Sequence, residues 1–296
     1  MRNLIHLTTT KSSLDGDDQT ISFDVTSVAA TDGDFIVLTN VGSLTYMQAG
    51  DDGYPYNDDG GDDNSTLTKK WNINLNSGEK EDDSWFKCSF VDEINAAICL
   101  SRRGKIAKID LDDVETEFDA QVEIVGEFEY GINCAAWSPD YEVLLLHVSM
   151  GGDGSCLLSM NNFLEVMSEI TFSEKFSSEV VTMSWKGDAS AVSVSIVDGA
   201  DSVRRVRIYS RENLELQALG RMETGADVRN VYEGSCASDA TDNLAWNPNG
   251  SIIAAVQEMG RGTQVIFFEA CGLRHREFKL RVRIRLVALV NCLYVV

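Results

Sequence analysis

The sequence predicts an all-β fold, specifically a WD-type β-propeller with about five to six recognisable blades. Three observations support this prediction: short apolar runs with strand-like patterning, Gly, Asn and Asp clusters between them, and a tryptophan-containing segment that recurs along the chain. A recurrence of roughly 40 to 50 residues, with about four strands in each unit, is typical of propeller blades.

The first two units are weaker copies of the repeat. Residues 28–33 precede the apolar run 35–38, and residues 86–93, with Phe90 in the place of tryptophan, precede the run 96–100. The acidic stretch 49–64 between them is predicted to be a loop insertion on the rim. It lacks the spacing of a calcium-binding loop, so we interpret it as a solvated loop rather than a cation site.

The next three units each contain a strand ending in tryptophan, a tight turn and a second apolar strand. The tryptophans are Trp137, Trp185 and Trp246, and the anchors from Phe90 onward are 47, 48 and 61 residues apart. The polar stretch 227–242 explains the longest interval as a second loop insertion. We expect these tryptophans to pack between neighbouring blades rather than to stack on a ligand.

Turn chemistry follows each of these tryptophans. Pro139 and Pro248 stand two residues after Trp, where a fixed φ suits the first bend, and Gly187 takes this place in the middle unit. Asp or Asn comes next and supplies a local side-chain hydrogen bond.

Three further segments are interpreted as strands. Residues 191–197 alternate apolar and small polar side chains, as a half-buried strand does. Residues 161–170 fit either a helical turn or an edge strand, and we favour the strand. The basic segment 204–207 is interpreted as a solvent-facing edge, with a partner-docking patch as the alternative.

Composition limits the possible functions. The 296 residues include 25 Lys and Arg against 47 Asp and Glu, which gives a net charge of −22. Hydrophobic residues make up 44% of the chain, as in folded proteins. Such a negative field disfavours broad binding to nucleic acid or to an anionic membrane surface.

The end of the sequence differs from the rest. Residues 272–285 contain 6 bases and 1 acid, and residues 286–296 are apolar apart from Asn291 and too short to span a bilayer. The amino-terminal residues lack a secretory signal, so a cytoplasmic location is expected, with the nucleus as a second compartment.

No catalytic, cofactor-binding or metal-ligating residue is predicted, and no cofactor is expected. The three histidines, His6, His147 and His275, do not have metal-ligand spacing, and His147 is interpreted as a core residue. The seven cysteines are Cys88, Cys99, Cys134, Cys156, Cys236, Cys271 and Cys292. They are widely spaced without a Cys-x-x-Cys pair, so we expect buried reduced thiols. A propeller hydrolase with carboxylates in the central channel remains an alternative.

Four stretches in one order, 131–146, 183–188, 244–254 and 265–278, carry a more specific signal. The last of them joins Phe-Phe-Glu269, Gly-Leu-Arg-His275 and Glu-Phe278. The series resembles the amino-terminal propeller of the largest, scaffolding subunit of the Elongator complex. The resemblance covers residues 1–280 and leaves 281–296 as an atypical tail, as in a truncated form of a longer protein.

The resemblance implies a non-catalytic scaffold that supports carboxymethyl-type modification of the wobble uridine, U34, of transfer RNA. The expected partners are the other Elongator subunits, with no direct nucleic-acid contact by this fragment and no membrane association. The family's dimerisation region has no counterpart here. A generic WD-type interaction module in another complex is the alternative, and the sequence leaves open whether the ring closes.

Overall fold

The computed structural model describes residues 25–30, 34–48, 68–76, 83–111, 121–151, 154–172, 177–198, 203–220, 228–229, 244–259 and 262–280. The acidic insertion 49–64, nearly all of the stretch 227–242 and the tail 281–296 lie outside these ranges, as do His6, Cys236 and Cys292. No helix of the described part is long and apolar enough to cross a membrane.

Five antiparallel sheets follow one another along the described chain, each built from consecutive strands. The first sheet contains β1 (Val25–Ala30), β2 (Asp34–Thr39), β3 (Ser43–Gln48) and β4 (Thr68–Asn74). The second contains β5 (Trp85–Val91), β6 (Ala96–Ser101), β7 (Lys105–Asp110) and β8 (Val122–Glu127), with the short 3-10 helix η1 (Asp92–Ile94) after β5. The third contains β9 (Ile132–Trp137), β10 (Val143–Ser149), β11 (Ser155–Asn161) and β12 (Val166–Phe172).

The last two sheets repeat the pattern. The fourth contains β13 (Ser177–Trp185), β14 (Ala191–Asp198), β15 (Val203–Ser210) and β16 (Leu216–Leu219), and β17 (Val228–Arg229) pairs with β15. The fifth contains β18 (Leu244–Trp246), β19 (Ile252–Met259), β20 (Gly262–Glu269) and β21 (Arg274–Leu280). This succession of four-stranded sheets is a β-propeller, and it confirms the predicted fold class.

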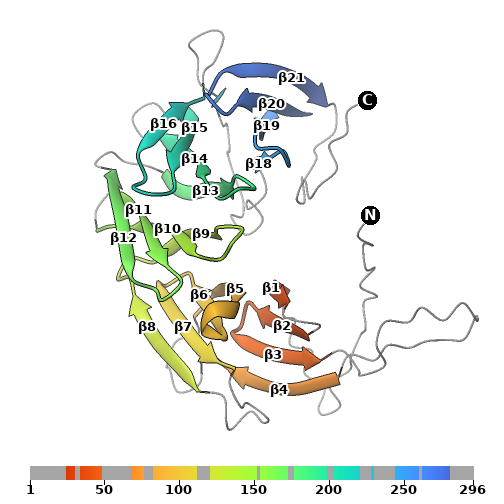
Figure 1. The fold of residues 1–296 in the computed structure, drawn as a ribbon, viewed down its shortest axis with the longest axis vertical. Helices are drawn as coiled ribbons and strands as arrows, with labels where there is room; N and C mark the ends of the chain where they lie inside the picture. The colour runs from red at the N-terminus through yellow and green to blue at the C-terminus, as the bar shows by residue number, and fades with distance from the viewer. Residues whose placement is uncertain are drawn as a thin grey trace, which may run out of the picture.

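The sheets follow an arc in chain order (Figure 1). The first strand of each sheet lies toward the inside of the arc, and the last strand forms its outside (Figure 1). Apolar side chains from successive sheets pack in four clusters, one at each boundary between neighbours. Among the described residues no such cluster joins the fifth sheet to the first, so this part of the chain forms an open arc of five blades.

The repeat tryptophans lie at these boundaries, as predicted. Trp137 packs in the cluster between the second and third sheets, Trp185 between the third and fourth, and Trp246 between the fourth and fifth. Each of these tryptophans is 8–9% exposed. Propeller blades bury both faces against neighbours, so a large side chain at the end of each inner strand fills the boundary.

Two strand predictions needed correction, and one was right. Residues 191–197 lie in β14, but the strand is not half-buried, because Ser193 and Ser195 face the next sheet and are 0% and 3% exposed. The segment 204–207 is not an edge, because β15 pairs with β14 on one side and with β16 and β17 on the other. The segment 161–170 does end in a strand, since a turn at 162–163 leads into β12 at the edge of the third sheet.

Candidate interaction surface

The clearest repeated polar feature of the described chain is the set of turns that follow the three tryptophans. These turns, residues 138–142, 186–190 and 247–251, are called the three-turn surface below. Each opens with the same backbone bond, in which the first residue donates its amide to the carbonyl five residues later. The donor and acceptor pairs are Ser138 and Val143 at 2.8 Å, Lys186 and Ala191 at 2.9 Å, and Asn247 and Ile252 at 2.9 Å.

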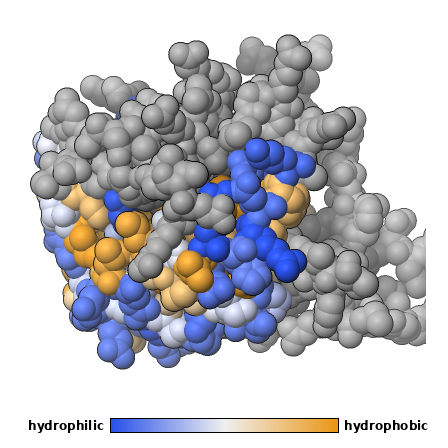
Figure 2. Space-filling model, turned by 90° about the horizontal axis from the view of Figure 1, so that it is seen from above, coloured by the Kyte–Doolittle hydropathy of each residue, from blue (hydrophilic) through white to orange (hydrophobic). Residues whose placement is uncertain are grey.

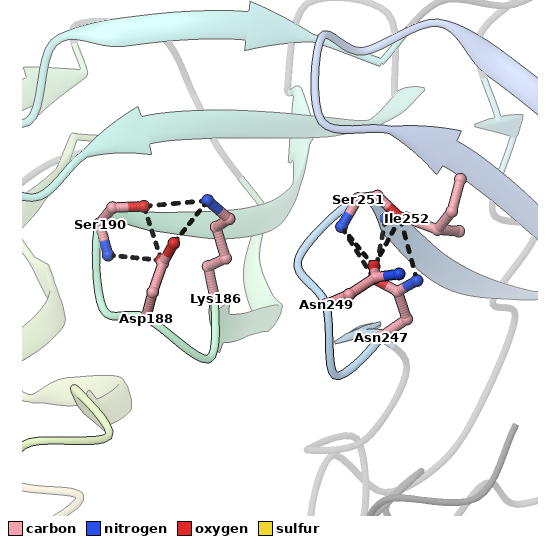
Figure 3. Close-up of polar contacts among 7 residues, drawn as sticks. All are labelled: Lys186, Asp188, Ser190, Asn247, Asn249, Ser251 and Ile252. Carbon is pink, nitrogen blue, oxygen red and sulfur yellow. Dashed lines mark hydrogen bonds and ion pairs between the residues drawn. The ribbon is translucent and has the colours of Figure 1, made fainter.

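A carboxylate or amide side chain closes each turn. Asp140 Oδ1 accepts from the amide of Glu142 at 3.2 Å, Asp188 Oδ1 from Ser190 at 3.0 Å, and Asn249 Oδ1 from Ser251 at 3.1 Å. Figure 3 shows the second and third of these turns side by side, with the Asp188 and Asn249 side chains in equivalent positions. The residue after each Asp or Asn has a left-handed backbone, with φ of 57°, 58° and 69° at Tyr141, Ala189 and Gly250. The sequence motif therefore specifies one turn geometry three times.

Charged side chains connect these turns to each other. In the second turn Lys186 Nζ donates to Asp188 at 2.8 Å and to Ser190 at 3.2 Å (Figure 3). Arg211, from the turn between β15 and β16, binds both Asp140 and Glu142 of the preceding blade. Its backbone amide donates to Ser190 O at 3.2 Å, so one residue connects the first two turns.

These contacts change the acidity of the turn carboxylates. Partial burial opposes the charged form of Asp140, but hydrogen bonds from Ser138 and Arg211 outweigh it, and the pKa of Asp140 is lowered. Hydrogen bonds from Lys186 and Ser190 lower the pKa of Asp188. Both carboxylates are therefore charged at neutral pH, and they act as fixed hydrogen-bond acceptors.

Exposed aromatic and apolar side chains accompany this polar set. Tyr141 is 42% exposed, and Phe163, in the turn before β12, is 68% exposed. The described exposed hydrophobics of the fourth and fifth sheets include Leu216, Leu219 and Leu273. Figure 2 looks onto the side of the molecule where these sheets lie, and hydrophobic residues gather there among hydrophilic ones. Exposed apolar side chains that gather on one side of a protein mark sites of protein–protein contact more often than sites of catalysis.

The histidines are placed as follows. His147 on β10 is 0% exposed, and its Nδ1 lies 3.2 Å from Asn133 Nδ2, which confirms its assignment to the core. Burial lowers the pKa of His147 to about 4. His275 on β21 is exposed, and its Nδ1 lies 3.2 Å from Glu269 Oε1. Of the two described histidines, His147 is therefore a core residue and His275 a surface residue.

Metal-binding and basic candidates can also be placed. In the part of the chain that the structure describes, no three His, Cys, Asp or Glu side chains group in a way that could hold a metal ion.

The described basic residues 274–279 form part of β21, where Arg274 pairs with Glu277. The side chains of Arg204 and Arg205 lie outside the described set, and Arg207 is half-buried.

Sequence reasoning missed two arginines that join blades. Arg211 has no motif around it, and its partners lie 71 and 69 residues away. The Arg102 guanidinium lies 4.1 Å from the centre of the Phe86 ring and donates to Asn133 O in the third sheet. Burial lowers the pKa of Arg102. Only the arrangement of the blades brings these partners together, so no local pattern predicts them.

Comparison with solved structures supports the fold. The β-propeller domain of Cps50 (Swd1) from Myceliophteria thermophila superposes with a TM-score of 0.53 and 10% identity, over 86% of this chain and 72% of that one. A putative 6-phosphogluconolactonase from Bacteroides fragilis gives a TM-score of 0.55 and 12% identity, over 87% of this chain and 70% of that one. At such low identity both similarities concern the fold alone.

Sequence relatives are more specific. Elongator complex protein 1 of Schizosaccharomyces pombe is 27% identical in an alignment that covers 63% of this chain and 17% of that protein. The Rattus norvegicus protein is 27% identical in an alignment that covers 54% of this chain and 14% of that protein. The Saccharomyces cerevisiae protein is 24% identical over a region covering 95% of this chain and 25% of that protein. The chain thus spans a quarter or less of the length of these relatives.

The family model described as the ELP1 first N-terminal beta-propeller matches residues 1–178 and 172–288. Together the two matches cover almost the whole chain, including every tryptophan-anchored turn of the three-turn surface. The chain therefore belongs to the family of the first amino-terminal β-propeller of Elongator complex protein 1.

Proposed function

We propose that this chain acts as a non-catalytic scaffold within the Elongator complex and supports carboxymethyl-type modification of the wobble uridine, U34, of transfer RNA. The observation that carries the proposal is the family match over residues 1–178 and 172–288. The relatives are named as subunits of a complex, and a propeller offers such a complex a rigid body with several surfaces for contact.

The described surface fits protein partners better than nucleic acid. Asp140, Glu142, Asp188 and Glu215 lie on or beside the three-turn surface. The basic residues paired with them are Lys186 in the second turn and Arg211 beside it, which leaves four carboxylates against two cations. A phosphate backbone approaching this side would meet this excess of negative charge. We therefore propose that the chain contacts other Elongator subunits and not the transfer RNA itself.

Affinity capture from cells tests membership of the complex. The tagged chain is expected to co-purify with other Elongator subunits, identified by quantitative mass spectrometry. Recovery of a different, reproducible complex would favour the alternative of a general interaction module. Fluorescence microscopy of the same tagged chain checks the proposed location in the cytoplasm and the nucleus.

Nucleoside analysis tests the proposed role in modification. Loss of the gene is expected to deplete carboxymethyl-type wobble uridine in total transfer RNA, as measured by mass spectrometry. Unchanged levels of these nucleosides would refute the proposed role. Binding of labelled transfer RNA to the purified chain, followed by anisotropy, is expected to be undetectable at physiological salt.

Matched surface variants test where partners bind. Phe163→Ser removes a 68% exposed aromatic side chain near the three-turn surface, and Val28→Ser removes a 51% exposed side chain from β1. Neither side chain is buried, so both variants should fold. We expect Phe163→Ser to reduce co-purification of Elongator subunits and Val28→Ser to leave it unchanged.

A further inference from the structure

Two buried cysteines face each other across neighbouring strands of the second sheet. Cys88 on β5 is the direct register partner of Cys99 on β6. They are 3% and 0% exposed, and both pack in the cluster between the first and second sheets. Directly opposed residues have Cβ atoms about 4.5–5.5 Å apart. A disulfide needs about 3.5–4.5 Å, so a small approach of the two strands would bring the thiols into bonding geometry.

We propose that Cys88 and Cys99 form a redox-sensitive dithiol, which glutathione disulfide oxidises to a cross-strand disulfide when the first sheet separates from the second.

Packing of the first sheet against the second protects Cys88 and Cys99 in their reduced form. A side-chain hydrogen bond with Cys88, together with burial, raises the pKa of Cys99 well above its usual value. A protonated thiol is a poor nucleophile, so the Cys99 thiol reacts slowly while the first sheet packs against the second. The first sheet covers the pair through Ala29 and Ile36, and Ser27 Oγ donates to Cys88 O at 3.0 Å. Exposure of the thiols therefore requires the first sheet to move.

The first sheet is suited to this movement. Among the described residues it shares an apolar cluster with the second sheet only, whereas the second, third and fourth sheets each share clusters with two neighbours. Its separation breaks a single boundary and leaves the remaining clusters intact. Partial openings of this kind cost less than global unfolding and are the usual route to a buried reactive group.

The reaction is ordinary thiol–disulfide exchange in two steps. The first protein thiol loses its proton and attacks one sulfur of glutathione disulfide, which forms a mixed disulfide and releases one glutathione thiolate. The second protein thiol loses its proton and attacks the protein sulfur of the mixed disulfide, which releases the second glutathione. The two cysteines are oxidised, glutathione disulfide is reduced to two glutathiones, and the two released protons are taken up by the two glutathione thiolates.

The other described cysteines provide controls within the chain. Cys134 is opposite His147, and Cys156 is opposite Val148 on one side and Thr171 on the other. Both are buried like the pair but have no cysteine opposite them. Cys271 is exposed and should form a mixed disulfide with glutathione in the folded chain, so it reports that the oxidant is active.

The test is oxidation of the full chain by glutathione disulfide, followed by alkylation of the remaining thiols, digestion and mass spectrometry. We expect a peptide pair joined through Cys88 and Cys99 while Cys134 and Cys156 remain free for alkylation. In Cys99→Ser, Cys88 is expected to stop at the glutathione mixed disulfide. Modification of Cys134 or Cys156 before any joined peptide appears would overturn the proposal.

A matched pair of core variants tests the role of the first sheet. Ile36 packs between the first and second sheets and Ile253 between the fourth and fifth, and both are 0% exposed. We expect Ile36→Ala to speed formation of the joined peptide by about tenfold or more relative to Ile253→Ala. Ile36→Val and Ile253→Val replace them if either alanine variant fails to fold. Equal rates in the two variants would show that oxidation follows global unfolding, and this would overturn the proposed opening.

Discussion

The three repeat tryptophans occupy equivalent positions but differ at the indole nitrogen. Trp185 Nε1 donates to Ala136 O and Trp246 Nε1 donates to Ser184 O, each at 3.0 Å and each across a blade boundary. The Trp137 indole nitrogen is buried without an acceptor. Each acceptor is the carbonyl of the residue before the tryptophan of the preceding blade. In the blade before Trp137 the equivalent residue is Ser89, which precedes Phe90, and its carbonyl does not accept from Trp137. The repeat is therefore identical in packing but not in hydrogen bonding.

Replacement of each tryptophan by phenylalanine should reveal this difference. All three variants lose a similar apolar volume, but Trp185→Phe and Trp246→Phe also leave a backbone acceptor without its donor. Because a net hydrogen bond contributes about 1 kcal/mol, we expect these two to lose at least about 1 kcal/mol more unfolding free energy than Trp137→Phe. Urea unfolding measures the three values. Equal losses in all three would show that the cross-boundary bonds do not stabilise the fold.

His147 makes stability depend on pH. Burial lowers its pKa to about 4 in the folded chain, against about 6.5 in an unfolded one. Above pH 6.5 both states are neutral. As pH falls from 6.5 to 4 only the unfolded state takes up a proton, so the folded state loses about 3 kcal/mol of relative stability. Urea unfolding at pH 7 and pH 4 is expected to show this loss in the wild type and its absence in His147→Gln, and parallel profiles would contradict it.

At the scale of elements, the sequence predicted best what is encoded locally. The Trp-x-Pro-Asp, Trp-x-Gly-Asp and Trp-x-Pro-Asn segments specify turns through proline, glycine and Asx chemistry, and the three turns have one geometry. Which faces of a strand are buried is not encoded locally. The alternation in β14 indicates one buried face, yet Ser193 is buried because another sheet covers the polar face as well. The contacts of Arg211 with Asp140 and Glu142 depend on the same stacking of blades and therefore could not be predicted.

Glycines in the turns differ in how much a side chain would disturb them. Gly272 has a φ of +83°, and a Cβ built on it would lie 2.3 Å from Leu219 O in the neighbouring sheet. A Cβ on Gly154 would meet nothing closer than 3.6 Å. We expect Gly272→Ala to cost at least about 2 kcal/mol and the control Gly154→Ala less than about 0.5 kcal/mol. Thermal unfolding of both variants measures this, and similar costs would mean that the turn accommodates the added methyl group.

At the scale of the whole molecule, each sheet is stabilised by packing against the sheets next to it. The described apolar clusters connect only consecutive sheets, so each blade depends on its immediate neighbours. In such an arrangement stability is close to a sum of terms for single blades and for boundaries between neighbours. The sequence predicted the tryptophan repeat whose side chains pack at these boundaries between sheets. The sequence left open whether the ring closes, because closure depends on packing between units far apart in the chain.

The first and fifth sheets should therefore open before the three between them. Each end sheet shares one described apolar boundary, whereas β6, β10 and β14 lie in sheets held on both sides. Native-state hydrogen exchange with mass spectrometry should give lower opening free energies for amides of β2 and β20 than for amides of these three central strands. Ile36→Ala should lower the opening free energy of β2 and leave that of β20 unchanged, because the boundary that it weakens is not shared by the fifth sheet. A single opening free energy for all five sheets would show instead that the arc unfolds as one cooperative unit.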